Sequence, residues 1–242
     1  MLLPKLNRIT YRLTLPSNDK EITYRPFTVE EEKILLTAQE STSPDDVLNA
    51  MRQIINNCIQ TEIDVTKLPT FDIEYFFLNI RAKSTGEEIE LIVRHPNGVN
   101  SKEQPCDHKE NVKINIESIK VEKSKKHTNR FQLDDNVGVV MKYPSMEALA
   151  FGDLNDFDSF VKVIANSIEL IFDENDTYPA EDCSEKELIE FVMSMNQKQI
   201  AMIQEFFETM PVLKHEINYI CTGCECKESV TIQGFQNFFL SP

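Results

Sequence analysis

Three cysteines lie close together near the end of the chain, in the run Cys221-Thr-Gly-Cys224-Glu-Cys226. Cys221 and Cys224 have the Cys-x-x-Cys spacing of a zinc knuckle, in which two thiolates on a hairpin tip hold one side of a tetrahedral ion. Gly223 permits a tight turn between them, and Cys226 is a spare thiol. Because two ligands alone do not hold zinc, this pattern indicates a metal site only where a second set of ligands completes it.

An earlier polar loop contains the only candidates for that second set within the chain, His95, Cys106 and His108. Ten residues separate His95 from Cys106, and the Cys-x-His spacing of Cys106 and His108 is poor for a knuckle. We therefore expect two hairpin tips with free thiols, and we assign no metal ligand, cofactor or catalytic residue. Whether Cys221, Cys224 and Cys226 hold zinc with these three residues, or with a partner chain, stays open. A zinc-binding adaptor or regulatory interaction module is the alternative function.

Glycine spacing argues against nucleotide chemistry. The chain has six glycines, and the nearest two, Gly223 and Gly234, are eleven positions apart. Loops that cradle phosphates need clustered glycines, so P-loop and Rossmann motifs are absent, as are the zincin helix and the Gly-x-Ser-x-Gly elbow. With four histidines, a Cys–His pair stays open, because its members can be distant in sequence. We expect no enzyme; a pocket that placed a histidine against a thiol would favour a hydrolase.

Charge and hydropathy narrow the classes of partner. The chain of 242 residues carries 25 Lys and Arg against 40 Asp and Glu, a net charge of −15. Such acidity disfavours nucleic acid as a partner. No apolar run approaches the ~18 residues of a membrane span. The start, Met1-Leu-Leu-Pro4, is too short for a signal peptide. We expect an intracellular protein with reduced cysteines and no membrane partner.

The elements that must position these residues alternate between strands and helices. Alternation predicts an N-terminal β-hairpin from residues 9–13 and 22–25. Strands 89–93 and 112–116 should flank the loop of His95, and strands 216–220 and 229–232 should flank Cys221 to Cys226. Between them, capping boxes predict helix starts at Thr28, Ser184 and Asn196, and an apolar stripe predicts a helix over 157–168. The fold class is α+β, with a helical core and two strand–loop–strand hairpins like degenerate zinc ribbons.

Methionines and phenylalanines gather on the late helices. Such a group is either a packed helical hairpin or an adaptable groove for another protein. We expect a docking surface here, with Met202 and Phe206 exposed on it, and a second one on an apolar turn at Phe235, Phe238 and Phe239. The residues of the first group are Met193, Met195, Met202, Met210, Phe191, Phe206 and Phe207.

Two stretches resemble a known family. Tyr24-Arg-Pro-Phe-Thr-Val-Glu-Glu-Glu-Lys-Ile-Leu-Leu-Thr-Ala-Gln-Glu-Ser41 and Phe71-Asp-Ile-Glu-Tyr-Phe-Phe-Leu-Asn-Ile-Arg-Ala-Lys-Ser-Thr-Gly-Glu87 resemble the T-even-type phage baseplate family. Tyr219-Ile-Cys-Thr-Gly-Cys224 and Phe238-Phe239 are similar to its end. The resemblance also implies fuller cysteine knuckles at both loops. This chain departs at the first, where His95-Pro-Asn-Gly98 replaces a Cys-Pro-x-Cys knuckle, which favours loops that are structural remnants.

The resemblance implies a non-catalytic protein of tail morphogenesis, either a baseplate hub subunit or a hub assembly chaperone. Its partners would be other baseplate hub proteins, and it would act in the host cytoplasm or the virion baseplate. We expect a single domain over 1–242, divisible into 1–88, 89–143, 144–215 and 216–242. The hub protein that it contacts, its oligomeric state and its retention in the virion do not follow from the sequence.

Overall fold

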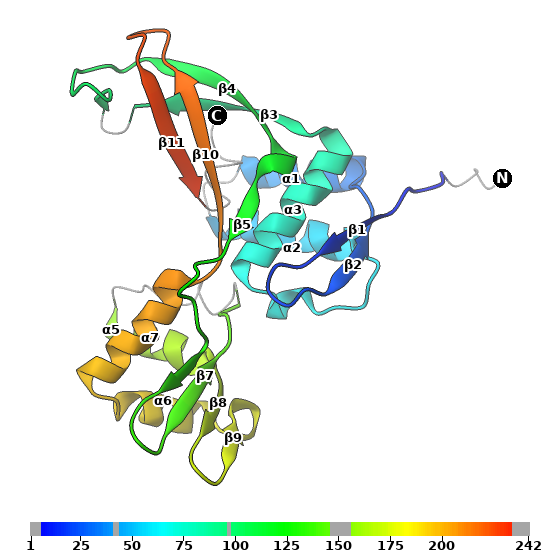
Figure 1. The fold of residues 1–242 in the computed structure, drawn as a ribbon. Helices are drawn as coiled ribbons and strands as arrows, with labels where there is room; N and C mark the ends of the chain where they lie inside the picture. Colours follow the sequence, from blue (N-terminus) through cyan, green and yellow to red (C-terminus); the bar gives the residue numbers. More distant parts are fainter. Residues whose placement is uncertain (1–5, 41–43, 96–97, 146–155, 234–242) are drawn as a thin grey trace, which may run out of the picture. The chain divides into compact units, whose positions relative to one another are not determined.

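Antiparallel hairpins and short helices alternate along the chain in the computed structural model, which describes residues 6–40, 44–95, 98–145 and 156–233. The class is α+β, as predicted (Figure 1). The chain forms two compact units. Unit 1 takes the described residues up to 65, then 71–122, and those from 212 onward, and unit 2 takes 66–70 and 123–211. The predicted single domain stays a prediction, because compactness does not test whether the units fold separately.

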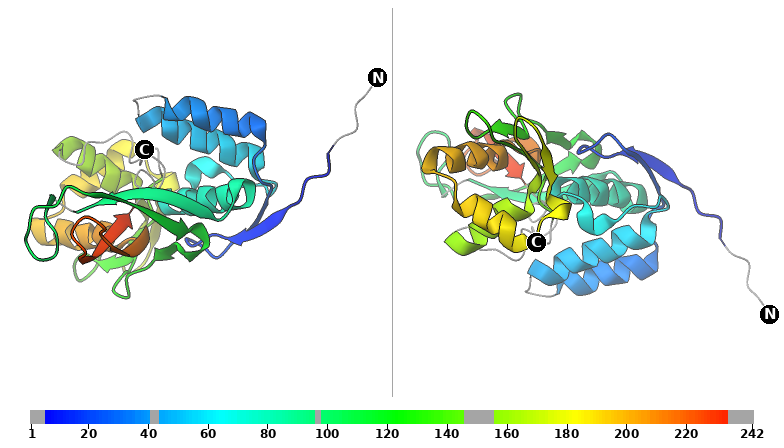
Figure 2. Two further views of the ribbon diagram at one scale, coloured as in Figure 1. Left: turned by 90° about the horizontal axis from the view of Figure 1, so that it is seen from above. Right: turned by 90° about the horizontal axis from the view of Figure 1, so that it is seen from below.

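Unit 1 begins with the predicted N-terminal hairpin, in which Tyr11 pairs with Tyr24. Helices α1 and α2 lie side by side (Figure 2). Strands β3 and β4 form a two-stranded sheet, and β11, β10 and β5 form a three-stranded sheet in that order. The elements are β1 (Tyr11–Thr14), β2 (Glu21–Tyr24), α1 (Val29–Gln39), α2 (Pro44–Cys58), α3 (Thr70–Thr85), β3 (Glu88–Arg94), β4 (Lys109–Asn115), η3 (Ile116–Ser118), β5 (Lys120–Glu122), β10 (Val212–Ile220) and β11 (Lys227–Gln233). Between α2 and α3, the short helix η1 (Val65–Lys67) leads into the segment 66–70, which belongs to unit 2.

After unit 2, the chain re-enters unit 1 at β10, which pairs with β5. Val212, the first residue of β10, pairs with Glu122, the last residue of β5. The two sheets share one apolar core with the end of α3, in which Leu78, Ile114 and Leu213 are buried. Both hairpins, β3–β4 and β10–β11, therefore extend from one packed base.

The residues of the first family-like stretch form internal contacts. Arg25 and Glu31 make a buried ion pair, with 2.8 Å between Nη2 and Oε1. The N–H and hydroxyl of Thr28 also donate to Glu31, each at 2.7 Å, so the predicted capping box is present. The Arg25 hydrogen bond is the largest cause that lowers the pKa of Glu31 to about 2. This stretch therefore fixes the passage from β2 to α1.

The second stretch ties the hairpin to α3. Asp72 is fully buried and accepts hydrogen bonds from the Ser17 backbone N–H, at 3.0 Å, and from the Ser17 hydroxyl. Burial raises the pKa of Asp72 to about 6, although both Ser17 bonds act in the opposite direction. The β1–β2 turn is thus held on the first turn of α3.

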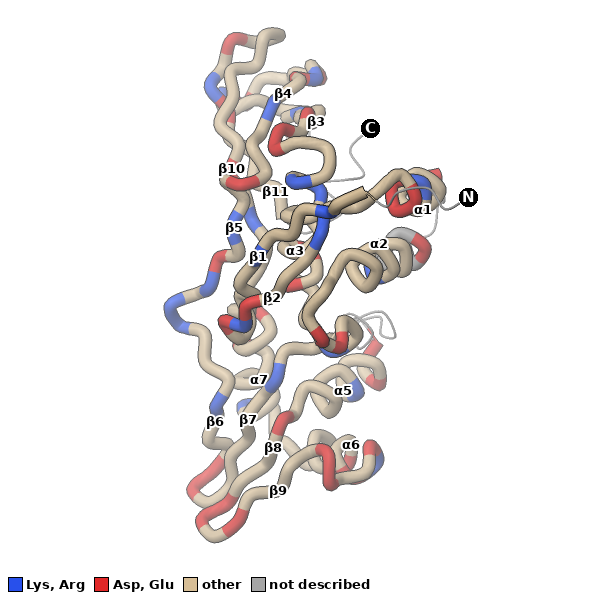
Figure 3. The backbone as a smooth tube through the Cα atoms, turned by 90° about the vertical axis from the view of Figure 1, so that its right-hand side faces the viewer, with Lys and Arg blue, Asp and Glu red and all other residues tan. Residues whose placement is uncertain are grey.

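Unit 2 contains a four-stranded antiparallel sheet, in the order β6-β7-β8-β9, and its described residues also form three α-helices. Its core includes Val139, Ile164, Ile203 and Phe206. The β6–β7 and β8–β9 turns carry acidic residues (Figure 3). The elements are β6 (Arg130–Gln132), β7 (Gly138–Met141), α5 (Phe157–Asn166), β8 (Ile168–Phe172), β9 (Thr177–Pro179), η4 (Ala180–Asp182), α6 (Glu185–Met193) and α7 (Gln197–Thr209). Among the described residues of the chain, no helix has the length and apolar character needed to cross a membrane.

Unit 2 confirms two helix starts and corrects two other expectations. The capping boxes at Ser184 and Asn196 are present. The helix predicted over 157–168 ends at Asn166, and Ile168 begins β8. The expected exposure of Phe206 is wrong, because its side chain is 1% exposed in the core. The apolar turn predicted at 235–239 lies outside the described residues.

Candidate metal centre

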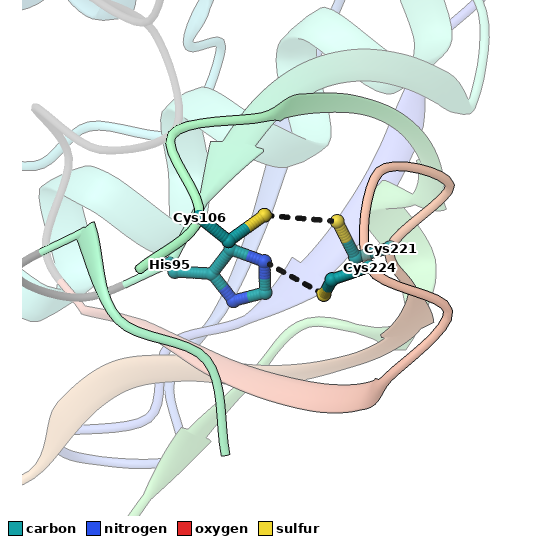
Figure 4. A group of neighbouring side chains, drawn as sticks. All are labelled: His95, Cys106, Cys221 and Cys224. Carbon is teal, nitrogen blue, oxygen red and sulfur yellow. Dashed lines mark hydrogen bonds between the residues drawn. The ribbon is translucent and has the colours of Figure 1, made fainter. Parts of the chain in front are cut away.

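The tips of the β3–β4 and β10–β11 hairpins of unit 1 meet. His95 and Cys106 come from the connection between β3 and β4, and Cys221 and Cys224 come from the turn between β10 and β11 (Figure 4). Their four ligand atoms all lie within 4.8 Å of one another. Four potential metal ligands from distant parts of the sequence therefore converge on one point.

Two distances describe the cluster. The Sγ atoms of Cys106 and Cys221 are 3.9 Å apart, and the Sγ of Cys224 is 3.6 Å from Nε2 of His95. A disulfide requires about 2.05 Å between its sulfurs, so Cys106 and Cys221 are thiols in contact. The imidazole and the three sulfurs face a common centre (Figure 4).

The β10–β11 turn places its cysteines through backbone hydrogen bonds. The N–H of Cys221 donates to the carbonyl of Cys226 at 3.0 Å, and the N–H of Glu225 donates to the carbonyl of Cys221 at 2.8 Å. Glu225 has a φ of 55°, the left-handed conformation that reverses the chain. The tight reversal brings Cys224 back beside Cys221, as the Cys-x-x-Cys spacing predicts.

The β3–β4 connection folds back on itself, which sequence spacing did not reveal. Gly98 donates its N–H to the carbonyl of His95 at 3.1 Å, and Cys106 donates its N–H to the carbonyl of Gly98 at 2.8 Å. The buried Asn100 side chain accepts from the N–H groups of Lys102 and Gln104, each at 3.0 Å. His95 and Cys106 consequently lie close together despite the ten residues between them.

Glycine at position 223 permits the close approach of the tips. A Cβ atom at Gly223 would lie 2.6 Å from Cβ and 2.7 Å from Cγ of His108, distances that real side chains do not tolerate. Hydrogen bonds also join the loops: Ser101 donates its N–H to Glu228 at 2.9 Å, and Thr222 donates its N–H to Glu110 at 2.8 Å. The two tips are thus packed and hydrogen-bonded together.

His95 is buried with an unsatisfied nitrogen. The residue is 2% exposed, and its Nδ1 has no hydrogen-bond partner among the described residues. A carboxylate oxygen, Oε1 of Glu228, lies 3.7 Å from Nδ1. A carboxylate behind the imidazole is the arrangement that orients a metal-binding histidine, because it favours the tautomer that leaves Nε2 without a proton.

The local electrostatics favour a thiolate at Cys224. Burial acts to raise the pKa of this thiol, but hydrogen bonds from the backbone of Cys226 and from nearby side chains, that of Asn100 first, lower it to about 6. A thiolate is the form that binds metals and also the form that attacks electrophiles. Cys224 is therefore suited both to metal binding and to nucleophilic attack.

Two of the six residues weighed from the sequence lie outside the four-residue cluster. His108 has a half-exposed side chain, and its Nε2 lies 2.8 Å from the Thr222 hydroxyl. Cys226 belongs to a second group with Cys224 and Glu228. The Sγ of Cys226 lies 3.5 Å from the Cys224 carbonyl and 3.6 Å from Nδ2 of Asn100.

An open cavity of about 680 Å³ adjoins the cluster. His95 and Cys106 line it, whereas Cys224 does not. The contact of Cys224 with His95 is the pairing that a cysteine hydrolase needs. The cavity, however, does not place a substrate at the Cys224 sulfur. Its lining is Arg94, His95, Gly98, Cys106, Asp107, Lys109 and Val230.

Comparison with known protein families supports the resemblance seen in residues 24–41 and 71–87. The model of the family described as T4 bacteriophage base plate protein matches residues 8–240. No curated protein and no solved structure matches the chain. The match covers nearly the whole chain, so it includes both units and the cysteine cluster. The chain belongs to the T4 bacteriophage base plate protein family.

Proposed function

We propose that the chain is a non-catalytic protein of phage tail morphogenesis that binds other proteins of the baseplate hub, as a hub subunit or as a hub assembly chaperone. The observation that carries the proposal is the family match over residues 8–240. A match of that extent concerns the architecture of the whole chain and not one site. The second candidate function, a zinc-binding adaptor, is favoured by the four-residue cluster.

The contacts of the two family-like stretches support a structural role. Arg25 and Glu31 neutralise one another inside unit 1, and Asp72 is engaged with Ser17. Side chains committed to internal contacts are not available for a substrate. The characteristic residues of these stretches therefore maintain a shape that other proteins can recognise.

Exposed methionines mark the surface that we assign to a partner. Met193, at the end of α6, is 56% exposed, and Met202, on α7, is 36% exposed. Both helices bury their other faces in the core of unit 2, through residues such as Leu188 and Ile203. Flexible, polarisable methionines adapt to varied apolar partners. The partner surface is accordingly an apolar patch on another baseplate protein.

Co-expression with the other baseplate proteins tests this assignment. The variant Met193→Glu/Met202→Glu should fold normally and lose at least tenfold in affinity for the partner that the wild type captures. The control variant Gln197→Glu/Gln204→Glu adds the same charge at exposed positions of α7 and should bind normally. Unchanged capture by the methionine variant contradicts the surface, and capture of no baseplate protein by the wild type contradicts the function.

A second measurement separates a subunit from an assembly chaperone. Tagged protein is recovered from the cytoplasm of infected cells, and the protein content of purified mature particles is determined in parallel. A hub subunit is present in both samples. A chaperone is bound to hub proteins in the cytoplasm and absent from particles. Absence from both samples contradicts both roles.

A further inference from the structure

We propose that His95, Cys106, Cys221 and Cys224 bind one Zn²⁺ ion, which links the β3–β4 connection to the β10–β11 turn. The inference is independent of the hub assignment, because it rests on the geometry of four side chains in unit 1. It also differs from the expectation drawn from sequence, which assigned no metal ligand.

Two distances in the cluster match the edges of a zinc tetrahedron. Bonds of about 2.3 Å to sulfur and about 2.0–2.1 Å to nitrogen give edges of about 3.8 Å between sulfurs and about 3.6 Å between sulfur and nitrogen. Two of the pairs measure 3.9 Å, for Cys106 and Cys221, and 3.6 Å, for Cys224 and His95. All other pairs lie within 4.8 Å, so side-chain shifts of about 1 Å complete the tetrahedron.

The donor atoms select the ion. Three thiolates and one imidazole are a Cys₃His set, which is typical of structural zinc. Calcium and magnesium prefer oxygen ligands, and the cluster offers none in its inner shell. The carboxylate of Glu228 stands behind the imidazole, 3.7 Å from Nδ1, where it orients the ring without binding the ion.

Four protein ligands make the site a closed one. A catalytic zinc keeps an open position for water or substrate, whereas a structural zinc has all four positions filled by the protein. The ion therefore acts as a cross-link between segments that are 115 residues apart, measured from Cys106 to Cys221. It is not placed to activate water.

The second group of potential ligands is a weaker candidate. Cys224 belongs to both groups, so the two groups compete for one thiolate. The Sγ of Cys226 already contacts the Cys224 carbonyl and the Asn100 amide, and the group contains only three members. Cys226 therefore provides a matched control two residues away from a proposed ligand.

Metal analysis of the purified full-length chain tests the proposal. The chain is prepared under reducing conditions without an affinity tag that binds metals, and zinc is measured by mass spectrometry and by competition with a chromogenic chelator. We expect about one zinc per chain for the wild type and for Cys226→Ser. Each of Cys106→Ser, Cys221→Ser and Cys224→Ser should bind zinc at least tenfold more weakly. Zinc-free wild type after titration, or equal loss in Cys226→Ser, overturns the proposal.

Loss of zinc binding in a variant can also result from misfolding. A substitution that replaces one type of zinc ligand by another controls for this. His95→Cys should retain one zinc per chain, because a thiolate replaces the imidazole in a tetrahedral site. In the cobalt-substituted protein, the visible spectrum of the wild type should be that of three thiolates and one nitrogen, and the variant should gain thiolate-to-cobalt absorption. An unchanged cobalt spectrum in His95→Cys means that His95 is not a ligand and overturns the assigned set.

Alkylation mapping separates a zinc ligand from a catalytic nucleophile. Cysteines are modified with iodoacetamide before and after chelator treatment and are identified by mass spectrometry. Zinc should protect Cys106, Cys221 and Cys224 together, and the chelator should expose all three while Cys183 in unit 2 reacts equally in both samples. Fast alkylation of Cys224 alone, insensitive to the chelator, contradicts zinc binding and favours the Cys–His pair.

Discussion

The two units each contain a histidine that sequence could not assign, and the surroundings of the two rings differ. In unit 2, His127 Nδ1 lies 3.0 Å from the Thr209 hydroxyl, and its Nε2 lies 3.0 Å from the Tyr143 hydroxyl. The ring also packs against Phe206, with 5.2 Å between centroids. In unit 1, the Nδ1 of His95 has no hydrogen bond among the described residues, and its Nε2 faces a thiol.

This difference separates a structural histidine from a metal-binding one. Both nitrogens of His127 have polar partners, so the ring needs nothing further. Burying a polar nitrogen without a partner costs free energy. The Nδ1 of His95 has no hydrogen bond among the described residues, and its Nε2 contacts the sulfur of Cys224, a weak hydrogen-bonding group, so the ring is less well satisfied than that of His127. A buried histidine indicates a site only when the protein leaves part of it unsatisfied.

The largest effect should come from removing the metal-binding histidine. At free zinc a thousandfold above its dissociation constant, zinc stabilises the wild type by about 4 kcal/mol, so a chelator should lower its melting temperature. The His95→Phe variant should already be destabilised and should show no chelator effect, whereas His127→Phe should keep the full effect. Thermal melts by circular dichroism, with and without chelator, measure both. If the chelator lowered the melting temperature of His95→Phe as much as that of the wild type, the proposed difference between His95 and His127 would be contradicted.

The second-largest effect concerns Asp72, a buried carboxyl group of unit 1 that is not one of the proposed zinc ligands. Raising the pKa of Asp72 from 3.8 to about 6 corresponds to about 3 kcal/mol. Because the folded protein binds the proton more tightly, this stabilisation is present below about pH 4 and is lost as pH rises through 6. Denaturant unfolding of the metal-free protein should show this loss in the wild type relative to Asp72→Asn. Parallel pH curves would refute the assignment to Asp72.

Substitutions at Gly138 in unit 2 and at Gly223 in unit 1 test whether zinc binding depends on unit 1 alone. A Cβ at Gly138 in unit 2 would lie 2.0 Å from the Phe172 ring, so Gly138→Ala should destabilise unit 2 by about 1–3 kcal/mol through overpacking and leave zinc binding intact. Gly223→Ala should separate the hairpin tips and weaken zinc binding about tenfold, or about 1.4 kcal/mol. Zinc titration and melting curves of both variants provide the measurement. Reduced zinc affinity in Gly138→Ala would show that the units are not independent in this respect.

The smallest effect should be the pH response of His127. Burial, with a smaller contribution from Lys123, lowers the pKa of His127. The neutral ring is therefore favoured in the folded protein, and its contribution to stability is present above about pH 6.5 and lost as pH falls. His127→Phe should lose about 1–2 kcal/mol at neutral pH, since two hydrogen bonds disappear, and should lose less on acidification. Unfolding at pH 7.5 and pH 5.5 checks the difference.

The sequence predicts what depends on neighbouring residues. Strand alternation located both cysteine-bearing hairpins, and the capping boxes at Thr28, Ser184 and Asn196 marked true helix starts. It failed where tertiary packing decides. Ile168 continues the helical stripe of α5 but starts β8, because it pairs with Met141 of β7.

The residues of the candidate site were recognised from the sequence, although no metal ligand was assigned to them. The Cys221–Cys224 spacing is local and was recognised, and Cys106 and His95 were weighed with it. Their relation to one another depends on hydrogen bonds around Gly98 and Asn100 that no spacing rule encodes. Phe206 was misplaced because an apolar helix face does not reveal whether the protein's own core or a partner covers it.

The pairing of Glu122 with Val212 affects how the chain tolerates insertions and deletions between these two residues. The polypeptide leaves unit 1 after residue 122 and re-enters it at residue 212, at neighbouring positions of one sheet. Residues 123–211, which form unit 2 together with 66–70, are therefore an insertion whose ends are already held together. Chains accept insertions most readily at such points. We expect changes of length in the turns of this insert to leave the register of β10 and β11 unchanged, so that the surface of unit 2 can vary while the cysteine-bearing hairpins keep their geometry.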